Sequence, residues 1–366
     1  MLVFFLLNLG QLINMRDKIC PTNGGDYINQ LEIIKSIAPE IRDIVERRYT
    51  ILRTIYYNQP IGRRALATEL DIGERIARNE VNILKDQGLI EIEAIGMYVT
   101  VEGKKILEEL SDVYMEFKGI LLLQEKLQTI LGIQKLIIVP GNSSDNELVL
   151  KEMGKITSSI IINMLQSKDI IGITGGSTMA AVASEMCKSE KPHDVMVIPA
   201  RGGLGSELET QANSIAAVIG NKLGGRYRLL NVPDTLEKDA LEIIVKNNEI
   251  KESIDLIKNI NILIFGIGRA DAMAIRRKLP KERINSLMEA GSVAEAFGHY
   301  FDIDGNEIWE YKTIGMTLDM YKQIRNLIGV AGGAQKAEAI IAITSLRRDI
   351  TIVTDESAAR RMLEIV

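Results

Sequence analysis

The first third of the chain, from about residue 31 to 110, alternates segments of helical periodicity with short interruptions. Apolar residues recur at helical spacing in the segment that starts after Pro39 and stops at Pro60. Two more helices are predicted in GRRALATEL and in ERIARNEVNILKDQG, and Gly88 ends the second of these. The following segment, LIEIEAIGMYVTVEG, alternates apolar and polar residues across Gly96, which is typical of a two-stranded hairpin. This order of elements predicts a winged helix-turn-helix.

From about Ile133 onwards, short apolar runs are followed by glycine-rich turns and then by helical stretches. Such alternation indicates βα units around a parallel sheet, and therefore an α/β domain of the Rossmann-like type. The predicted strands are LIIVP, DIIGIT, DVMVIPA, YRLL, NILIFG, LIGVAG and DITIVT.

These patterns divide the chain into four regions. We expect an unassigned N-terminal extension (1–26), a winged helix-turn-helix domain (27–110), a helical linker (111–132) and an α/β domain (133–366). The leucines between Val101 and Leu131 have heptad-like spacing, so this segment could either link the domains or pair with a second subunit.

Composition narrows the function classes. The 366 residues are 46% hydrophobic and 25% charged, as in a soluble globular protein with two or three domains. The net charge of -5 means that any contact with nucleic acid is local. Two cysteines (Cys20, Cys187) exclude a disulfide framework and favour a reducing cytoplasm. Two histidines (His193, His299) lack metal-binding spacing, so we expect neither a metal nor a cofactor.

The apolar segment Met1 to Leu12 is too short to span a bilayer, which takes about 20 residues. No positive charge precedes it, as a signal peptide requires. The segment is either a targeting sequence or a non-functional extension that arises from a start codon upstream of Met15, and we favour the extension. The roles of residues 1–14 and of Cys20 are not assigned. We expect a cytoplasmic protein without a membrane partner.

The third predicted helix is the candidate DNA-reading element. Ala77, Val81 and Leu84 share one face and are expected to pack on the preceding helices. The opposite face carries side chains of the types that read base edges or hold phosphates, namely Arg75, Arg78, Asn79, Asn82 and Lys85.

Two arginines and three acidic residues modify this interpretation. Arg63 and Arg64, at the start of the preceding helix, are placed to meet the phosphate backbone. The alternative is a solvated helix face in a protein-interaction module, because Glu74, Glu80 and Asp86 offset the cations. We favour DNA binding.

Glycine-rich turns after three predicted strands form a candidate anion site. The first turn holds Gly175, Gly176, Ser177 and Thr178 before a helix, without the lysine of a Walker A motif. The second holds Gly266 and Gly268 but has Asp271 where a dinucleotide fingerprint has its third glycine. The third, Gly332 and Gly333, precedes a helix with Lys336 in its first turn. With Arg201 and Arg276 nearby in the sequence, these turns suit a ligand with two phosphates.

The motifs GITGGSTMAAVA, VIPARGGLG, QANSIA, YRLLNVP, FGIGRADAMA, AEAFGHYFD, GMTLD and GVAGGAQKAEAI occur together and in this order. From about Gln30 to the C-terminus the chain thereby resembles the SorC/DeoR-type sugar-binding transcription regulators of bacteria. The resemblance implies an effector domain similar to aldose-ketose isomerases and glucosamine-phosphate deaminases. It also implies a repressor of an operon of triose-phosphate glycolytic enzymes, relieved by fructose 1,6-bisphosphate.

The resemblance also implies which residues bind the effector. The effector loop falls on Gly175, Gly176, Ser177 and Thr178. The basic residues that bind the bisphosphate fall on Arg201, Arg276 and Lys336, and the polar sugar contacts fall on Gln211 and Glu295. Arg269 has no counterpart that we can place.

A second function class, a sugar-phosphate isomerase or deaminase, is weighed against the regulator. Isomerisation needs a positioned acid and base. The nearby candidates are Asp271, Glu289, Glu295 and His299, and their spacing specifies no such pair. An attached winged helix is needed for operator binding and not for isomerisation, so a non-enzymatic repressor is favoured. Because one winged helix reads a short site, we expect a homo-oligomer on operator DNA.

Overall fold

The computed structural model describes residues 37–189, 193–204, 207–234 and 238–366. The interpretations of the N-terminal extension, including its apolar segment and Cys20, lie outside these residues. The chain divides into two compact units, and the boundary along the sequence falls between Gly119 and Ile120. None of the described helices combines the length and the apolar character needed to cross a bilayer.

The first unit contains the predicted winged helix-turn-helix. Its three helices and its antiparallel hairpin are confirmed, and a further helix follows the hairpin. Gly96 turns the hairpin with φ +154, and a Cβ there would lie 2.9 Å from the Ile61 amide nitrogen. In chain order, the elements are α3 (Pro39–Asn58), α4 (Arg63–Glu69), α5 (Glu74–Asp86), β1 (Ile90–Ile92), β2 (Met97–Val99) and α6 (Val101–Phe117).

The core of this unit forms where the apolar faces of its helices meet. The predicted inner face of α5 is confirmed, because Ala77, Val81 and Leu84 are buried. Val81 and Leu84 pack with residues of α3, α4 and the hairpin such as Ile55 and Leu66. The ring of Tyr49 on α3 stacks on that of Tyr114 on α6, with the ring centroids 4.3 Å apart.

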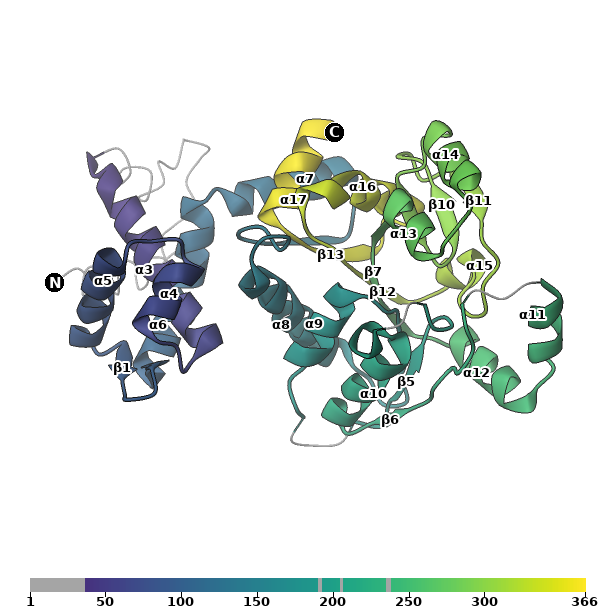
Figure 1. Ribbon diagram of the computed structural model, residues 1–366, viewed down its shortest axis with the longest axis horizontal. Coiled ribbons are helices and arrows are strands. Elements are labelled where there is room, and N and C mark those ends of the chain that lie inside the picture. The colour runs from purple at the N-terminus through teal and green to yellow at the C-terminus, as the bar shows by residue number, and fades with distance from the viewer. Residues whose placement is uncertain (1–36, 190–192, 205–206, 235–237) are drawn as a thin grey trace, which may run out of the picture. The chain divides into compact units, whose positions relative to one another are not determined.

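The second unit is built on a parallel sheet of seven strands (Figure 1). Six of the seven predicted strands are confirmed, whereas the predicted strand YRLL, residues 227–230, overlaps the observed β6 only at Tyr227. The strand order is β3-β13-β12-β7-β4-β5-β6. The strands are β3 (Lys135–Val139), β4 (Ile170–Ile173), β5 (Met196–Pro199), β6 (Arg226–Tyr227), β7 (Ile262–Gly266), β12 (Asn326–Val330) and β13 (Ile350–Asp355).

Helices cover both faces of this sheet. In Figure 1, α8, α9 and α10 lie on one side of the strands, and α7, α16 and α17 lie together on the other. Apolar residues of the strands pack against α8, α9 and α10 in one buried cluster. These helices are α7 (Ile120–Leu131), α8 (Glu147–Met164), α9 (Ser177–Glu185), α10 (Ala212–Leu223), α16 (Ala337–Leu346) and α17 (Glu356–Ile365).

A four-stranded antiparallel sheet that the sequence patterns did not predict is inserted between β7 and β12. Its strand order is β11-β10-β9-β8, and α13 and α14 pack on it through Ala270, Ala274, Leu287 and Tyr300. The strands are β8 (Gly268–Arg269), β9 (Ala294–Ala296), β10 (His299–Phe301) and β11 (Glu307–Glu310). The remaining helices are η2 (Leu208–Thr210), α11 (Lys238–Ile244), α12 (Asn248–Lys258), α13 (Ala270–Arg276), α14 (Lys281–Glu289), α15 (Leu318–Tyr321) and η3 (Ala334–Lys336).

The leucine-rich segment between the units forms two helices rather than one. Gly119, at φ +69, separates α6 from α7. Helix α6 packs on α3 in the first unit, whereas α7 packs on β3 and α17 in the second. The expected linker, residues 111–132, thus consists of the end of α6 and the whole of α7.

Candidate functional site

A pocket opens in the second unit between β4 and β7, where the order in which successive strands are added to the sheet reverses direction. From β4 the chain proceeds through β5 to β6 on one side, and from β7 through β12 to β13 on the other. Ligands of open α/β sheets bind at such a switch point, beyond the carboxyl ends of the strands. The lining residues come from the loops after β4, β5 and β7, from α13, β9 and η3. They include Thr174, Gly175, Gly176, Ser177, Thr178, Arg201, Gly266, Gly268, Arg269, Arg276, Glu295 and Lys336.

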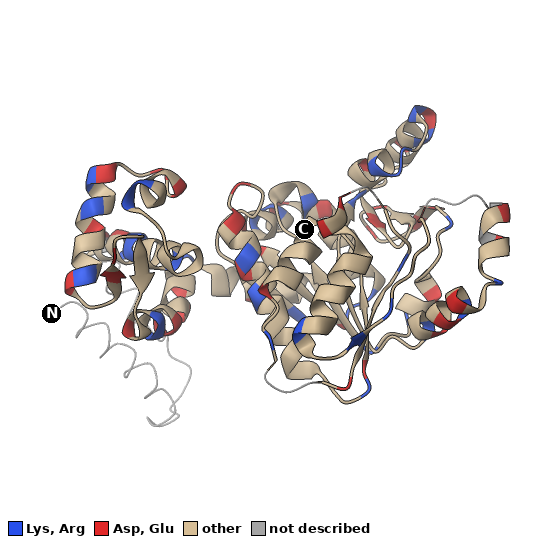
Figure 2. Cartoon of the chain, turned by 60° about the horizontal axis from the view of Figure 1, so that its bottom comes forward, with Lys and Arg blue, Asp and Glu red and all other residues tan. Residues whose placement is uncertain are grey.

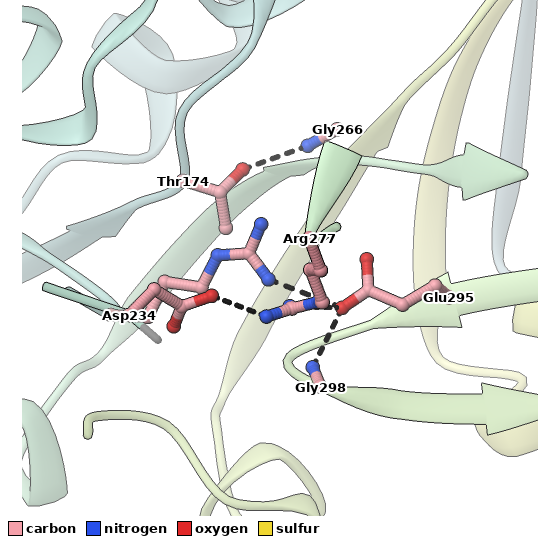
Figure 3. Close-up of polar contacts among 7 residues, drawn as sticks. Thr174, Asp234, Gly266, Arg277, Glu295 and Gly298 are labelled. Carbon is pink, nitrogen blue, oxygen red and sulfur yellow. Dashed lines mark hydrogen bonds and ion pairs between the residues drawn. The ribbon is translucent and has the colours of Figure 1, made fainter. Parts of the chain in front are cut away.

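The N-terminus of α9 forms one wall of the pocket. Its first amides have no partner within the helix and can donate to an anion. Gly175 permits the chain to pass close to η2, since a Cβ there would lie 2.7 Å from the Thr210 carbonyl oxygen. The Thr174 hydroxyl accepts a hydrogen bond of 3.0 Å from the Gly266 amide, which joins the loops after β4 and β7 (Figure 3).

Lys336, at the start of α16, lines another side of the pocket, and the turn before η3 positions it. Gly333 has φ +93, and its amide donates to Asp355 Oδ2 over 2.7 Å. The same carboxylate oxygen accepts from the amide and hydroxyl of Ser143, so it fixes the loop after β3 as well. Lys336 is thereby held at the start of α16. Burial lowers the pKa of Lys336, and the nearby Asp355 carboxylate only partly offsets this.

The charge of the lining favours an anionic ligand. Four basic side chains line the pocket, Arg201, Arg269, Arg276 and Lys336. Glu295 is the one acidic side chain among the described residues that line it. Arg269 is paired with Asp271, whose Oδ1 lies 3.0 Å from Arg269 Nε, so the aspartate that interrupts the dinucleotide-like motif neutralises an arginine.

Glu295 belongs to a chain of buried ion pairs behind the pocket. Its Oε1 accepts from Arg201 Nη1 at 3.1 Å, from Arg277 Nη2 at 2.8 Å and from the Gly298 amide at 2.7 Å. Arg277 also donates to Asp234, and both of these side chains are fully buried. In Figure 3, Arg277 lies between Asp234 and Glu295.

The ion pairs keep these buried groups charged. Burial of Glu295 opposes its ionisation, but the charges of Arg201 and Arg277 outweigh this and lower the pKa of Glu295. Burial likewise opposes the charged form of Arg277, yet Glu295 and Asp234 raise its pKa above the ordinary value. The pocket therefore keeps one fixed negative charge that is compensated by two arginines.

Of the nine residues expected to bind an effector, eight line this pocket, from Gly175 in the first turn to Lys336. Gln211 does not line it. Its Nε2 donates to the Leu204 carbonyl over 3.3 Å, which ties the start of α10 to the segment after β5. Arg277 and Asp234 were missed, because nothing in the sequence pattern pairs residues that are 43 positions apart.

The four acid-base candidates of the enzyme alternative do not converge in the pocket. Only Glu295 among them lines it. Asp271 is paired with Arg269, Glu289 is exposed on α14, and His299 Nδ1 lies 2.9 Å from Glu307. In the described part of the chain, no group of three or more histidine, cysteine or carboxylate side chains is arranged to hold a metal ion.

The first unit presents the predicted DNA-reading face on α5. The five residues predicted on that face are exposed, as are the two arginines at the start of α4: Arg63, Arg64, Arg75, Arg78, Asn79, Asn82 and Lys85. Arg64 Nε lies 3.8 Å from Glu74, and both side chains are largely exposed.

One acidic residue was placed wrongly by the sequence pattern. Glu80 is buried and faces α3, where Arg48 Nε lies 2.9 Å from its Oε2. It therefore does not offset the cations of the exposed face. Figure 2 shows acidic and basic residues interspersed along the helices, in keeping with a local rather than a global basic surface.

Known proteins combine the same two units. Residues 44–114 match the CggR N-terminal DNA-binding domain, and residues 115–364 match the Sugar-bind family of sugar-binding domains. The chain is 39% identical over 337 residues to the central glycolytic genes regulator of Bacillus subtilis, which covers 92% of this chain and 99% of the relative. The regulator of the same name from Priestia megaterium is 40% identical over 334 residues, covering 91% and 98%.

Solved structures agree with these matches. A SorC-family transcriptional regulator from Enterococcus faecalis has a TM-score of 0.62 at 35% identity, covering 66% of this chain and 99% of that one. The full-length sorbitol operon regulator from Klebsiella pneumoniae, at 19% identity, shares the fold over 88% of this chain and 99% of that one, with a TM-score of 0.64. The chain belongs to the SorC family of sugar-binding transcriptional regulators, with a DNA-binding unit followed by a sugar-binding unit.

Proposed function

We propose that this protein represses a glycolytic operon and that a phosphorylated sugar, fructose 1,6-bisphosphate, releases it from operator DNA. The relatives named central glycolytic genes regulators support the choice of operon. The choice of ligand rests on one observation. Two helix N-termini, each preceded by a glycine turn, and four basic side chains converge on one pocket.

The chemistry of the pocket suits a sugar with two phosphates. Amides at the start of α9, with Ser177 and Thr178, offer one anion cradle. Lys336 at the start of α16 offers a point charge for a second phosphate. Arg201 and Arg276 supply charge-assisted hydrogen bonds, and the Glu295 carboxylate can accept from a sugar hydroxyl.

In this proposal the first unit binds the operator. The exposed face of α5 reads bases, while Arg63 and Arg64 hold phosphates. A single winged helix reads only a short site, so the repressor acts as a homo-oligomer. Binding of the sugar favours an arrangement of subunits with lower affinity for DNA.

The test is a binding titration on the DNA upstream of the protein's own gene, with fructose 1,6-bisphosphate, fructose 6-phosphate or fructose added. We expect the bisphosphate to release the DNA at the lowest concentration, because only it carries two phosphates. Lys336→Ala and Arg276→Ala should bind DNA as the wild type does but fail to respond. Lys322→Ala, which changes an exposed lysine outside the pocket, is the matched control. Release by all three sugars at equal concentrations, or an unchanged response of both pocket variants, would contradict the proposal.

A further inference from the structure

The first unit has a hollow between α3 and α5, and one arginine of its lining, Arg47, is not among the predicted DNA contacts. We call it the α3–α5 hollow. Most of its lining belongs to α5, and one arginine comes from α3. The lining residues are Arg47, Arg75, Ile76, Arg78, Asn79, Glu80 and Asn82.

The base of the hollow is a buried carboxylate that two arginines of α3 share. Arg48 takes the closer position, with Nε 2.9 Å from Glu80 Oε2, and its side chain is 23% exposed. Arg47 Nη1 lies 3.4 Å from Glu80 Oε1, and its side chain is 45% exposed. One carboxylate cannot neutralise two guanidinium groups, so a positive charge remains on the outer side.

Arg47 keeps most of its hydrogen-bonding capacity. A guanidinium has five N–H donors, and among the described residues Arg47 has one hydrogen-bonding contact, through Nη1. Within the part of the chain that the structure describes, Arg75 and Arg78 form no ion pair. Three arginines with donors to spare therefore line one hollow, with Asn79 and Asn82 beside them.

The position of Arg47 decides what it can reach. A helix with its side chains is about 10–12 Å across and fills a major groove about 12 Å wide. If α5 occupies the groove, a side chain from the neighbouring α3 meets the edge of the groove, where the phosphates lie. Glu80 holds one end of the Arg47 guanidinium, Nη1, beside α5, which limits how far this group can move.

We propose that the α3–α5 hollow binds a backbone phosphate of DNA and that Arg47 contacts this phosphate directly. The inference rests on the proposed function, because it requires α5 to enter the major groove. It assigns to α3 a part in DNA binding that the α5 face and the α4 arginines do not cover. A phosphate contact carries no sequence information, so the hollow contributes affinity and register rather than base specificity.

The experiment measures binding of the full chain to operator DNA and to a random duplex of equal length, from 50 to 300 mM salt. Each lost phosphate contact makes the slope of log affinity against log salt shallower by about 0.9. We expect Arg47→Ala to weaken binding to both duplexes by the same factor and to reduce the slope by about 0.9 for each subunit on the DNA. Arg47→Lys keeps a charge at this position and should restore most of the slope.

Lys104→Ala is the matched control, because it removes one positive charge from an exposed side chain of α6 in the same unit. Its slope should equal that of the wild type. Thermal unfolding of each variant verifies that the unit is folded. If Arg47→Ala unfolds, Arg47→Gln, which also removes the charge but keeps a longer polar side chain, should show the same loss of slope.

Three results would overturn the inference. The first is a salt slope for Arg47→Ala equal to that of the wild type. The second is a loss confined to the operator, which would make Arg47 a base-reading residue. The third is an equal change in Lys104→Ala, which would reduce the effect to overall charge. Failure of the proposed function looks different, because the wild type itself would then not distinguish operator from random DNA.

Discussion

At the scale of single residues, Lys336 lies in the candidate binding pocket, in an environment that disfavours its positive charge. It lines the pocket at the start of α16, and burial lowers its pKa from the ordinary value near 10.5. A phosphate bound beside it favours the protonated form, so binding draws a proton to Lys336. Affinity for the effector is then highest while the lysine is protonated and falls as the pH rises through its lowered pKa.

We therefore predict that affinity for fructose 1,6-bisphosphate decreases as the pH rises from neutral toward 10.5, the ordinary pKa of lysine. Phosphate monoesters have their second pKa near 6, so the ligand itself does not change charge in this interval. In Lys336→Arg, whose guanidinium stays charged, the affinity should remain nearly constant. Calorimetric titrations at several pH values measure both proteins. An equal decline in the arginine variant would assign the effect to another group.

Arg276 and Arg277 show what a sequence can and cannot reveal about the site. Neighbouring residues on a helix point about 100° apart, so one arginine lines the pocket while the next is fully buried. The sequence pattern predicted Arg276, which follows the second glycine turn. The role of Arg277 depends on Asp234 and Glu295, which only the folded chain brings together. Removing one partner of such a buried pair typically costs about 3–5 kcal/mol, because a charge is left uncompensated.

At the scale of elements, α5 and α4 are expected to contribute in different ways to DNA binding. If α5 lies in the major groove, Arg78→Ala or Asn79→Ala should weaken operator binding by roughly 1–3 kcal/mol and random DNA much less. Arg63→Ala should weaken both equally, with a shallower salt dependence. Titrations on operator and random duplexes measure these losses. Equal losses on both for the α5 variants would reject base reading by this helix.

The accuracy of the sequence prediction differed among elements for a physical reason. The strands of the parallel sheet are buried on both faces, and such strands read as continuous apolar runs bounded by turns. In the antiparallel sheet, β8 has two residues and β9 has three, with a buried Glu295 inside β9. Strands this short give no period to detect. The sequence therefore predicted the sheet that positions the α9 and η3 starts, but not the sheet that presents Glu295.

At the scale of the whole molecule, regulation requires that DNA and sugar favour different arrangements of the subunits. An effector shifts an equilibrium only by the ratio of its affinities for the two arrangements. Tight binding to both would leave operator affinity unchanged. A bisphosphate that joins the α9 and α16 starts draws together loops that follow β4 and β12, which lie on opposite sides of β7. In the proposed homo-oligomer, the resulting shift would be transmitted to the contacts between subunits.

Such coupling is reciprocal, and this gives a test on the intact protein. If saturating fructose 1,6-bisphosphate weakens operator binding by some factor, saturating operator must weaken sugar binding by the same factor. Typical coupling energies of 1–3 kcal/mol correspond to factors of roughly 5–150. We predict equal factors when sugar affinity is measured with and without operator DNA, at one protein concentration and with the assembly state followed by sedimentation. A sugar affinity that does not change when operator is added would show that the pocket and the DNA-binding unit are not coupled, and that the sugar is not the inducer.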